Sequence, residues 1–272
     1  MLELMLAISL SLFLSLGMMS IFIHSKNIYR LTQSLGTIPT KARMAFYLLS
    51  HDIRMAGFIG CVRLMDALPI NSGLTGDTSL IVWHKGHTAA KLSLPKLARY
   101  QKDSDAILIQ FLDPNTFPIK EAKSSRIILA HWKLFRPRDI LLISDCQHAE
   151  LIHWSDIHLA HSYQMDSEIG FFNKIIYYIA DTGRVSETGQ RIYALYRRNL
   201  NQSVYKPTEL IEGINRMSIR LGIKNSDGIL YYKNANEVKH WPDAHSVEIR
   251  LLLTDVKQLH REWKQVIGLR ER

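Results

Sequence analysis

The chain opens on an apolar segment that a globular domain cannot readily bury. Residues 4–23 read LMLAISLSLFLSLGMMSIFI and include no charged side chain. As a helix rising about 1.5 Å per residue, this segment matches the ~30 Å hydrocarbon core of a bilayer. Its polar groups are serines, whose hydroxyls can bond carbonyl oxygens of the preceding turn, whereas a helix buried in a soluble core would normally show a polar face. The sequence therefore predicts a membrane-spanning helix over residues 1–23, represented by positions Leu4, Ala7, Ser11, Leu14 and Ile21.

The charges at the two ends of this segment are unusual. Glu3 lies at its edge, where a carboxylate either reaches the lipid headgroups or requires a partner. No Lys or Arg precedes the segment, while Lys26 and Arg30 follow it, so the positive-inside rule alone would leave the C-terminal body in the cytoplasm. A cleavable signal peptide fits no better, because its basic start is missing. We therefore expect a basic stretch upstream of Met1.

An amphipathic helix is predicted to follow, over residues 24–58. Its apolar stripe recurs at spacings of three and four residues and consists of Ala42, Phe46, Leu49, Ile53 and Ala56. Gly36 and Pro39 predict a kink or short break between the membrane segment and this stripe, and Gly57 provides a stop signal. The stripe predicts a stalk that packs on a domain.

The remaining residues, 59–272, change from helical to two-residue periodicity, which is typical of strands. The predicted strands are 79–83, 106–112, 126–135, 139–144, 174–180, 191–197, 217–223, 228–232 and 246–253. Apolar and polar residues alternate most clearly in the segments that begin at Met217 and Ser246, so one face of each is expected to be solvated. The predicted fold class is α+β, with a long helix packed on a mostly antiparallel β domain.

The two cysteines, Cys61 and Cys146, are too far apart in sequence for a CxxC site. In an exported domain such a pair predicts one structural disulfide; the alternative is two buried free thiols. The net charge of +9 would suit DNA or lipid headgroups. Because the Lys and Arg residues are scattered, a solvated basic surface is the simpler interpretation.

The sequence contains no motif of a phosphate-binding loop, zinc protease or nucleophile elbow. Imidazole and carboxylate groups, which together suit divalent metals, are concentrated in one stretch at Asp145, His148, His153, Asp156, His158 and His161. If this stretch is extended, His148 and His158 face one way, while His153 and His161 face the other. We therefore expect no metal site, no cofactor and no enzymatic activity.

Several blocks of the sequence resemble a known family. The segment from Leu2 to Ile8 is similar to the type IV prepilin motif, an apolar helix that carries one glutamate. Further blocks resemble minor pilins of the PilW type, in the same order: residues 26–30 (KNIYR), 51–61 (HDIRMAGFIGC), 144–146 (SDC), 194–198 (ALYRR) and 209–213 (ELIEG). Together with the predicted strand at Val247, they extend over nearly the whole chain.

The resemblance implies a lollipop-shaped structural subunit that helps to initiate type IV pilus assembly, and hence twitching motility, adhesion or DNA uptake. It implies an inner-membrane, single-pass protein whose domain is periplasmic and later joins the pilus fibre or tip. Its implied partners are other minor pilins, the major pilin and the inner-membrane assembly platform. Glu3 matches the glutamate that contacts the N-terminal amine of a neighbouring subunit in that family.

The chain departs from the family motif at its start. Family members begin with a basic leader that ends in glycine and is removed by a prepilin peptidase, and no such leader precedes Leu2. We expect one upstream of Met1, which would also supply the missing basic charges. Two other classes remain open: a type II secretion pseudopilin, and a single-span periplasmic enzyme or metal-binding protein.

Overall fold

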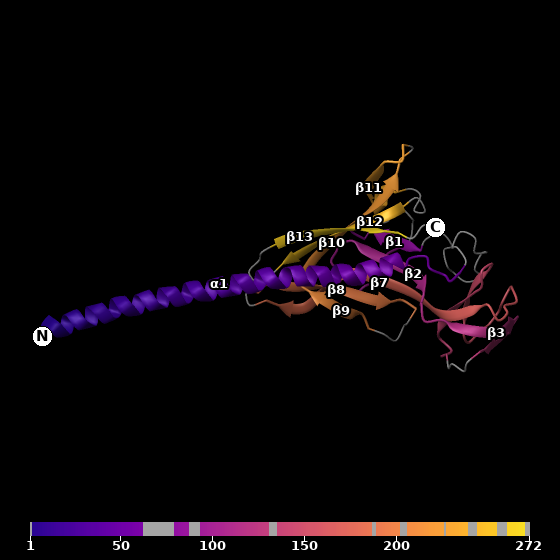
Figure 1. The fold of residues 1–272 in the computed structure, drawn as a ribbon, viewed down its shortest axis with the longest axis horizontal. Coiled ribbons are helices and arrows are strands. Elements are labelled where there is room, and N and C mark those ends of the chain that lie inside the picture. The colour runs from indigo at the N-terminus through magenta and orange to yellow at the C-terminus, as the bar shows by residue number, and fades with distance from the viewer. Residues whose placement is uncertain are drawn as a thin grey trace.

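The computed structural model describes residues 2–61, 79–86, 93–130, 135–186, 189–201, 206–225, 227–238, 244–254 and 260–269. One helix, α1 (Leu2–Arg54), extends far beyond the domain with its N-terminal half and lies along the strands with its C-terminal half (Figure 1). The rest of the described chain consists of antiparallel strands and one short 3-10 helix, η1 (Ala235–Glu237). The predicted combination of an N-terminal apolar helix with a mostly antiparallel β domain is confirmed.

The larger sheet is organised by one long strand, β7 (Glu168–Val185), which pairs with β2, β3, β5 and β8. Its nine strands also include β1, β4, β6 and β9. Their bounds are β1 Leu80–Trp83, β2 Ala106–Leu112, β3 Phe117–Lys123, β4 Arg126–Leu129, β5 Ile140–Ser144, β6 Ala149–His153, β8 Arg191–Asn199 and β9 Thr208–Glu212. Every pairing in this sheet is antiparallel. The pairs β1–β2, β3–β4, β5–β6 and β8–β9 are each joined to the rest of the sheet through β7.

The smaller sheet has four strands in the order β11-β10-β12-β13. Their bounds are β10 Ile214–Lys224, β11 Leu230–Asn234, β12 Ala244–Thr254 and β13 His260–Gly268. Met217 lies opposite Leu251 and Ile219 lies opposite Ile249, and all four side chains are fully buried. As the alternation predicts, these residues lie on the buried face of the sheet. This face belongs to the main core, to which α1 and the larger sheet also contribute.

Two buried residues just before β2 join the two sheets. Ser104 Oγ accepts a hydrogen bond from the backbone N–H of Met217 at 2.9 Å, and Asp105 Oδ2 accepts one from Ile219 at 2.6 Å. Burial raises the pKa of the Asp105 carboxyl, whereas its backbone hydrogen bonds oppose that rise. Because both partners are backbone groups of β10, the contact fixes the position of one sheet against the other.

A second, aromatic cluster supports the strands near the disulfide. Phe135 is buried and makes edge contacts with Phe117, Trp154 and Phe171, whose ring centroids lie 5.7, 4.9 and 5.5 Å away. These residues come from β3, β7 and the segments that flank β5 and β6. The β5–β6 hairpin therefore has its own apolar support, separate from the main core.

The predicted kink is wrong, because α1 runs through Gly36 and Pro39 without a break. The hydroxyl of Thr40 donates to the carbonyl oxygen of Gly36 at 3.0 Å, and Ile38 is already buried against the domain. Contacts with the β domain thus begin at the proline itself. They favour a continuous helix over the break that local preference suggests.

The strand predictions differ from the structure mainly in polar segments. Strands β3, β6, β9 and β13 were not predicted, because each contains charged residues or a proline that weakens the two-residue pattern. The predicted strand 126–135 is shorter, since β4 ends at Leu129. Residues 131–134 of that prediction lie outside the described residues.

Candidate functional site

The first half of α1 is an exposed apolar surface. Residues Leu2–Arg30 form a segment long and apolar enough to cross a membrane, and none of its most apolar stretch is buried in the structure. Large side chains such as Phe13 are 78% exposed. A surface of this size and composition predicts contact with lipid or with other apolar helices. It is the candidate site.

The residues predicted to represent this surface all lie exposed on α1. They are Leu4, Ala7, Ser11, Leu14 and Ile21, and Glu3 lies in the first turn of the helix. The hydroxyl of Ser9 donates to the carbonyl of Leu6, and that of Ser11 to the carbonyl of Ile8, both at 2.9 Å. These serines therefore satisfy their hydrogen-bonding groups within the helix, as an apolar environment requires.

The second half of α1 is packed on the β domain. The predicted stripe is buried at every position: Ala42, Phe46, Leu49, Ile53 and Ala56. Tyr47 on the opposite face is 66% exposed. The stripe lies in the main core beside strands of both sheets, so the exposed half of the helix and the domain form one continuous body.

A buried ionic contact joins α1 to the larger sheet. Asp52 is only 5% exposed. Its Oδ2 accepts hydrogen bonds from the Tyr177 hydroxyl at 2.6 Å and from Arg197 Nε at 3.2 Å. Burial and the nearby negative charge of Asp52 raise the pKa of Tyr177, so the phenol stays protonated and continues to donate. We call these three residues the stalk clamp.

The stalk clamp was not predicted. Asp52 lies three residues after Leu49 and beside Ile53, which is within the apolar stripe of α1. An acidic residue within an apolar stripe indicates a buried polar contact, because a buried carboxylate requires a partner. Its partner, Arg197, is remote in sequence, so the pair could not be identified from periodicity.

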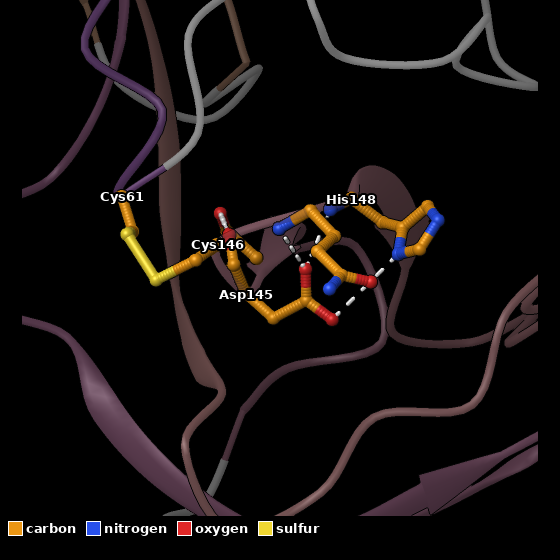
Figure 2. Close-up of a disulfide and its surroundings, with 6 residues drawn as sticks. Cys61, Asp145, Cys146 and His148 are labelled. Atoms are coloured by element: carbon orange, nitrogen blue, oxygen red, sulfur yellow. Dashed lines mark hydrogen bonds and ion pairs between the residues drawn. A yellow bond between two sulfur atoms is a disulfide. The ribbon is translucent and has the colours of Figure 1, made fainter.

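The chain just beyond α1 is joined to the β5–β6 hairpin by a disulfide between Cys61 and Cys146, whose Cα atoms lie 4.8 Å apart (Figure 2). Asp145 supports the hairpin turn, because its Oδ1 accepts the backbone N–H groups of Gln147 and His148 at 2.7 and 2.5 Å. The disulfide thus holds a segment that already has an ordered turn.

Gly60 allows this close approach. It has a φ of +95°, and a Cβ atom on it would lie 2.7 Å from Glu168 Oε1 and 2.8 Å from Ser144 Oγ. Both distances are shorter than a Cβ atom tolerates. A Cβ atom at residue 60 would therefore require the side chains of Glu168 and Ser144 to move, next to the disulfide.

We expect Gly60→Ala to lower the free energy of unfolding by about 2–4 kcal/mol, through backbone strain and overpacking. Gly189→Ala is the matched control, because Gly189 has a φ of +79° but nothing within 4 Å of the added Cβ. The control should lose only about 1–2 kcal/mol from backbone strain. Urea unfolding of both variants measures the difference, and equal losses would show that the contacts of residue 60 do not matter.

Blocks that resemble PilW-type proteins meet in the structure. The 51–61 block contacts the 194–198 block through Asp52 and Arg197, and it contacts the 144–146 block through the disulfide. The hydroxyl of Tyr196 donates to Glu209 Oε2 at 3.0 Å, which joins the 194–198 and 209–213 blocks. These blocks therefore surround the junction between the helix and the domain.

The histidine-rich stretch is not extended throughout, which corrects the prediction about its faces. β6 ends at His153, and a turn at Trp154 and Ser155 reverses the chain. As a result His161 stacks on His148, with ring centroids 4.1 Å apart, although a period of two would place them on opposite faces. Within the described residues, no three His, Cys, Asp or Glu side chains form a group that could hold a metal ion.

The fold and the exposed helix together define an α+β protein, and the described residues include one candidate membrane segment, which could serve as an anchor or as a signal. Residues 176–267 match the model of the family PilW, Type IV Pilus-assembly protein W. This match supports a PilW-type pilus protein, as the sequence blocks predicted. It covers Tyr177, Arg197 and the smaller sheet except for Gly268, the last residue of β13. No curated protein and no solved structure matches the chain.

Proposed function

We propose that this protein is a structural minor pilin that takes part in the initiation of type IV pilus assembly. The observation that carries the proposal is the unbroken helix α1, exposed and apolar over its first half and buried in the domain over its second half. The PilW match supports a role in pilus assembly. In this proposal the chain has a lollipop form, with α1 as the stem and the two sheets as the head.

Before assembly, the first half of α1 spans the inner membrane and the β domain lies in the periplasm. During assembly, the helices of neighbouring subunits replace lipid around the same apolar surface. Because lipid and apolar side chains are similarly hydrophobic, this exchange costs little, and close packing and polar contacts then determine which helices associate. Twitching, adhesion or DNA uptake would follow from the fibre that is formed.

Glu3 supplies the polar contact in this proposal. A carboxylate within apolar surroundings is stabilised by a cation, and the N-terminal amine of a neighbouring subunit is a suitable one. Leaving such a charge without its partner is costly. The pair would therefore fix the axial register of one helix against the next.

We expect Glu3→Ala to remain in the membrane fraction but to reduce surface pili at least about tenfold, because an ion pair in low dielectric contributes more than ~1.4 kcal/mol. Glu262→Ala is the control, since Glu262 is an exposed acid on β13. It should leave piliation unchanged. Electron microscopy gives the number of surface pili, and immunoblots of the membrane fraction give the amount of the chain in the membrane.

Co-purification from membranes tests the partners. The wild-type chain should recover other minor pilins. When the same amount of the Glu3→Ala variant is purified, it should recover less of them. Recovery of secretion-system pseudopilins in their place would contradict a pilus function, and normal piliation by Glu3→Ala would contradict the role of Glu3.

A further inference from the structure

The larger sheet has one face toward α1 and one face away from it. Side chains alternate along β7, so Tyr177, whose hydroxyl contacts Asp52 of α1, lies on the first face, and Lys174 lies on the second. Arg198 of β8 also lies on the second face, because it pairs with Ile176 of β7. We call this second face the outer face.

Three cationic residues lie close together on the outer face. Since Arg198 pairs with Ile176, Arg198 and Lys174 are diagonal neighbours, which are typically about 7–8 Å apart. The carbonyl oxygen of Lys96 accepts a hydrogen bond from Arg198 Nη1 at 3.4 Å, which places Lys96 next to Arg198. Lys96 is exposed, and the other two side chains are partly exposed. We call these three residues the cationic patch.

The cationic patch is not neutralised by the protein itself. Within the part of the chain that the structure describes, no ion pair involves any of its three residues. By contrast, Arg184, Arg191 and Arg197 of the same two strands each lie beside an acid. Like charges that lie close together repel each other, so an anion from outside the chain would stabilise the patch.

The Arg198 side chain still has donors for such an anion. Among the described residues, its guanidinium makes one hydrogen bond, the long contact with the carbonyl oxygen of Lys96. Its Nε is buried without a hydrogen-bond partner there. A guanidinium offers several N–H groups in a fork that matches the oxygens of a phosphate. The patch therefore favours a phosphate over a weakly hydrogen-bonding anion.

The patch lies far from the candidate membrane segment. Arg197, the neighbour of Arg198, contacts Asp52 of α1. Asp52 is about 22 residues beyond Arg30, the end of that segment, which corresponds to about 33 Å along the helix. If α1 crosses the inner membrane as proposed, the headgroups beside Arg30 lie out of reach. The geometry thus favours a phosphate polymer in solution over a lipid.

We propose that Lys96, Lys174 and Arg198 bind the phosphate backbone of DNA. Neutralisation of phosphates by Lys and Arg supplies most of the affinity when DNA is bound without sequence preference. The spacing of about 7–8 Å between two of the cations corresponds to about two steps of 3.4 Å along one strand. This inference deepens the proposed function and rests on it, because bound DNA would be carried by the pilus.

The experiment titrates the full-length protein, in an uncharged detergent, into a short fluorescein-labelled DNA duplex of random sequence. Fluorescence anisotropy at several salt concentrations gives the slope of log K against log salt concentration. We expect a slope of about −3 for three phosphate contacts. Lys96→Gln, Lys174→Gln and Arg198→Gln should each reduce its magnitude by about 1, and the triple variant should bind at least about tenfold more weakly.

The matched control removes the same number of charges elsewhere. Lys123→Gln, Arg191→Gln and Lys264→Gln are combined, because these cations are exposed and each already lies beside an acid. This triple control should bind DNA nearly as well as the wild type. Arg198→Lys keeps the charge and should keep the slope, which separates the charge of Arg198 from its packing. Cooperative urea unfolding confirms that each variant is folded.

The proposal fails if the control triple variant loses as much affinity as the patch triple variant, because net charge alone would then explain binding. It also fails if the slope is the same in the wild type and the patch triple variant. Equal competition by phosphatidylglycerol in mixed micelles, at the same phosphate concentration, would assign the patch to lipid instead. The patch triple variant should assemble normal numbers of pili, so pilus counts test the proposed function separately from DNA binding.

Discussion

Replacing both Cys61 and Cys146 with serine is expected to lower the free energy of unfolding by about 4–5 kcal/mol. The disulfide closes a loop with a sequence separation of 85 residues. Without it, the unfolded chain gains conformational entropy, which favours unfolding. Urea unfolding of the full-length protein in detergent measures the change. Tryptophan fluorescence reports the unfolding of the domain, because Trp83, one of the five tryptophans, is fully buried in β1.

Reduction provides the control for this variant. A reducing agent should destabilise the wild type by the same amount and should leave the double serine variant unchanged. If the free energy of unfolding fell by less than about 1 kcal/mol, the disulfide would contribute little. The main core and the aromatic cluster around Phe135 would then account for the stability of this region. Mass spectrometry of the membrane-extracted protein confirms that the two thiols are joined at the start.

Arg197→Ala is expected to lower the free energy of unfolding by about 3–5 kcal/mol, because it removes the guanidinium from the buried carboxylate of Asp52. Asp52 then keeps only the hydroxyl of Tyr177 and the exposed ring of His51, whose Nδ1 lies 3.0 Å from Oδ1. Arg191→Ala is the matched control on the same strand. Its side chain is 72% exposed and lies 3.4 Å from Asp181, whereas that of Arg197 is 39% exposed. An exposed pair should contribute at most about 1 kcal/mol.

A double-mutant cycle with Asp52→Asn separates the ionic contact from the packing of the Arg197 side chain. We expect Arg197→Ala to cost much less when Asp52→Asn is already present, because no uncompensated charge remains. Equal losses in both backgrounds would show that the arginine acts through its aliphatic packing. Equal losses for Arg191→Ala and Arg197→Ala would contradict a special role of the stalk clamp.

The features that could be predicted from sequence depend on local periodicity. The stripe from Ala42 to Ala56 repeats at helical spacing and is buried at each of its positions. Met217 and Ile219 alternate with polar residues and lie in the buried face of β10. In both cases one face of the element meets the core, so hydrophobicity alone indicates the secondary structure.

The features that could not be predicted depend on contacts between distant segments. β13 carries charged residues on both sides of Trp263, so its sequence lacks a clear apolar face. The stack of His148 on His161 requires a reversal at Trp154 that no glycine or proline marks. Pro39 remains helical because neighbouring residues are packed on the domain, and that packing cannot be derived from the proline itself.

The uninterrupted helix connects its first turn to the β domain as one continuous element. Its 53 residues span about 80 Å, and its far end is fixed to the head by the stalk clamp. If the first half of α1 shifted by one residue along a neighbouring helix while the contact stayed on the same side, α1 and the head would turn by about 100° around the helix axis. In the proposed assembly, a contact made by Glu3 in the first turn would thereby set the direction in which the β domain faces, tens of ångströms away.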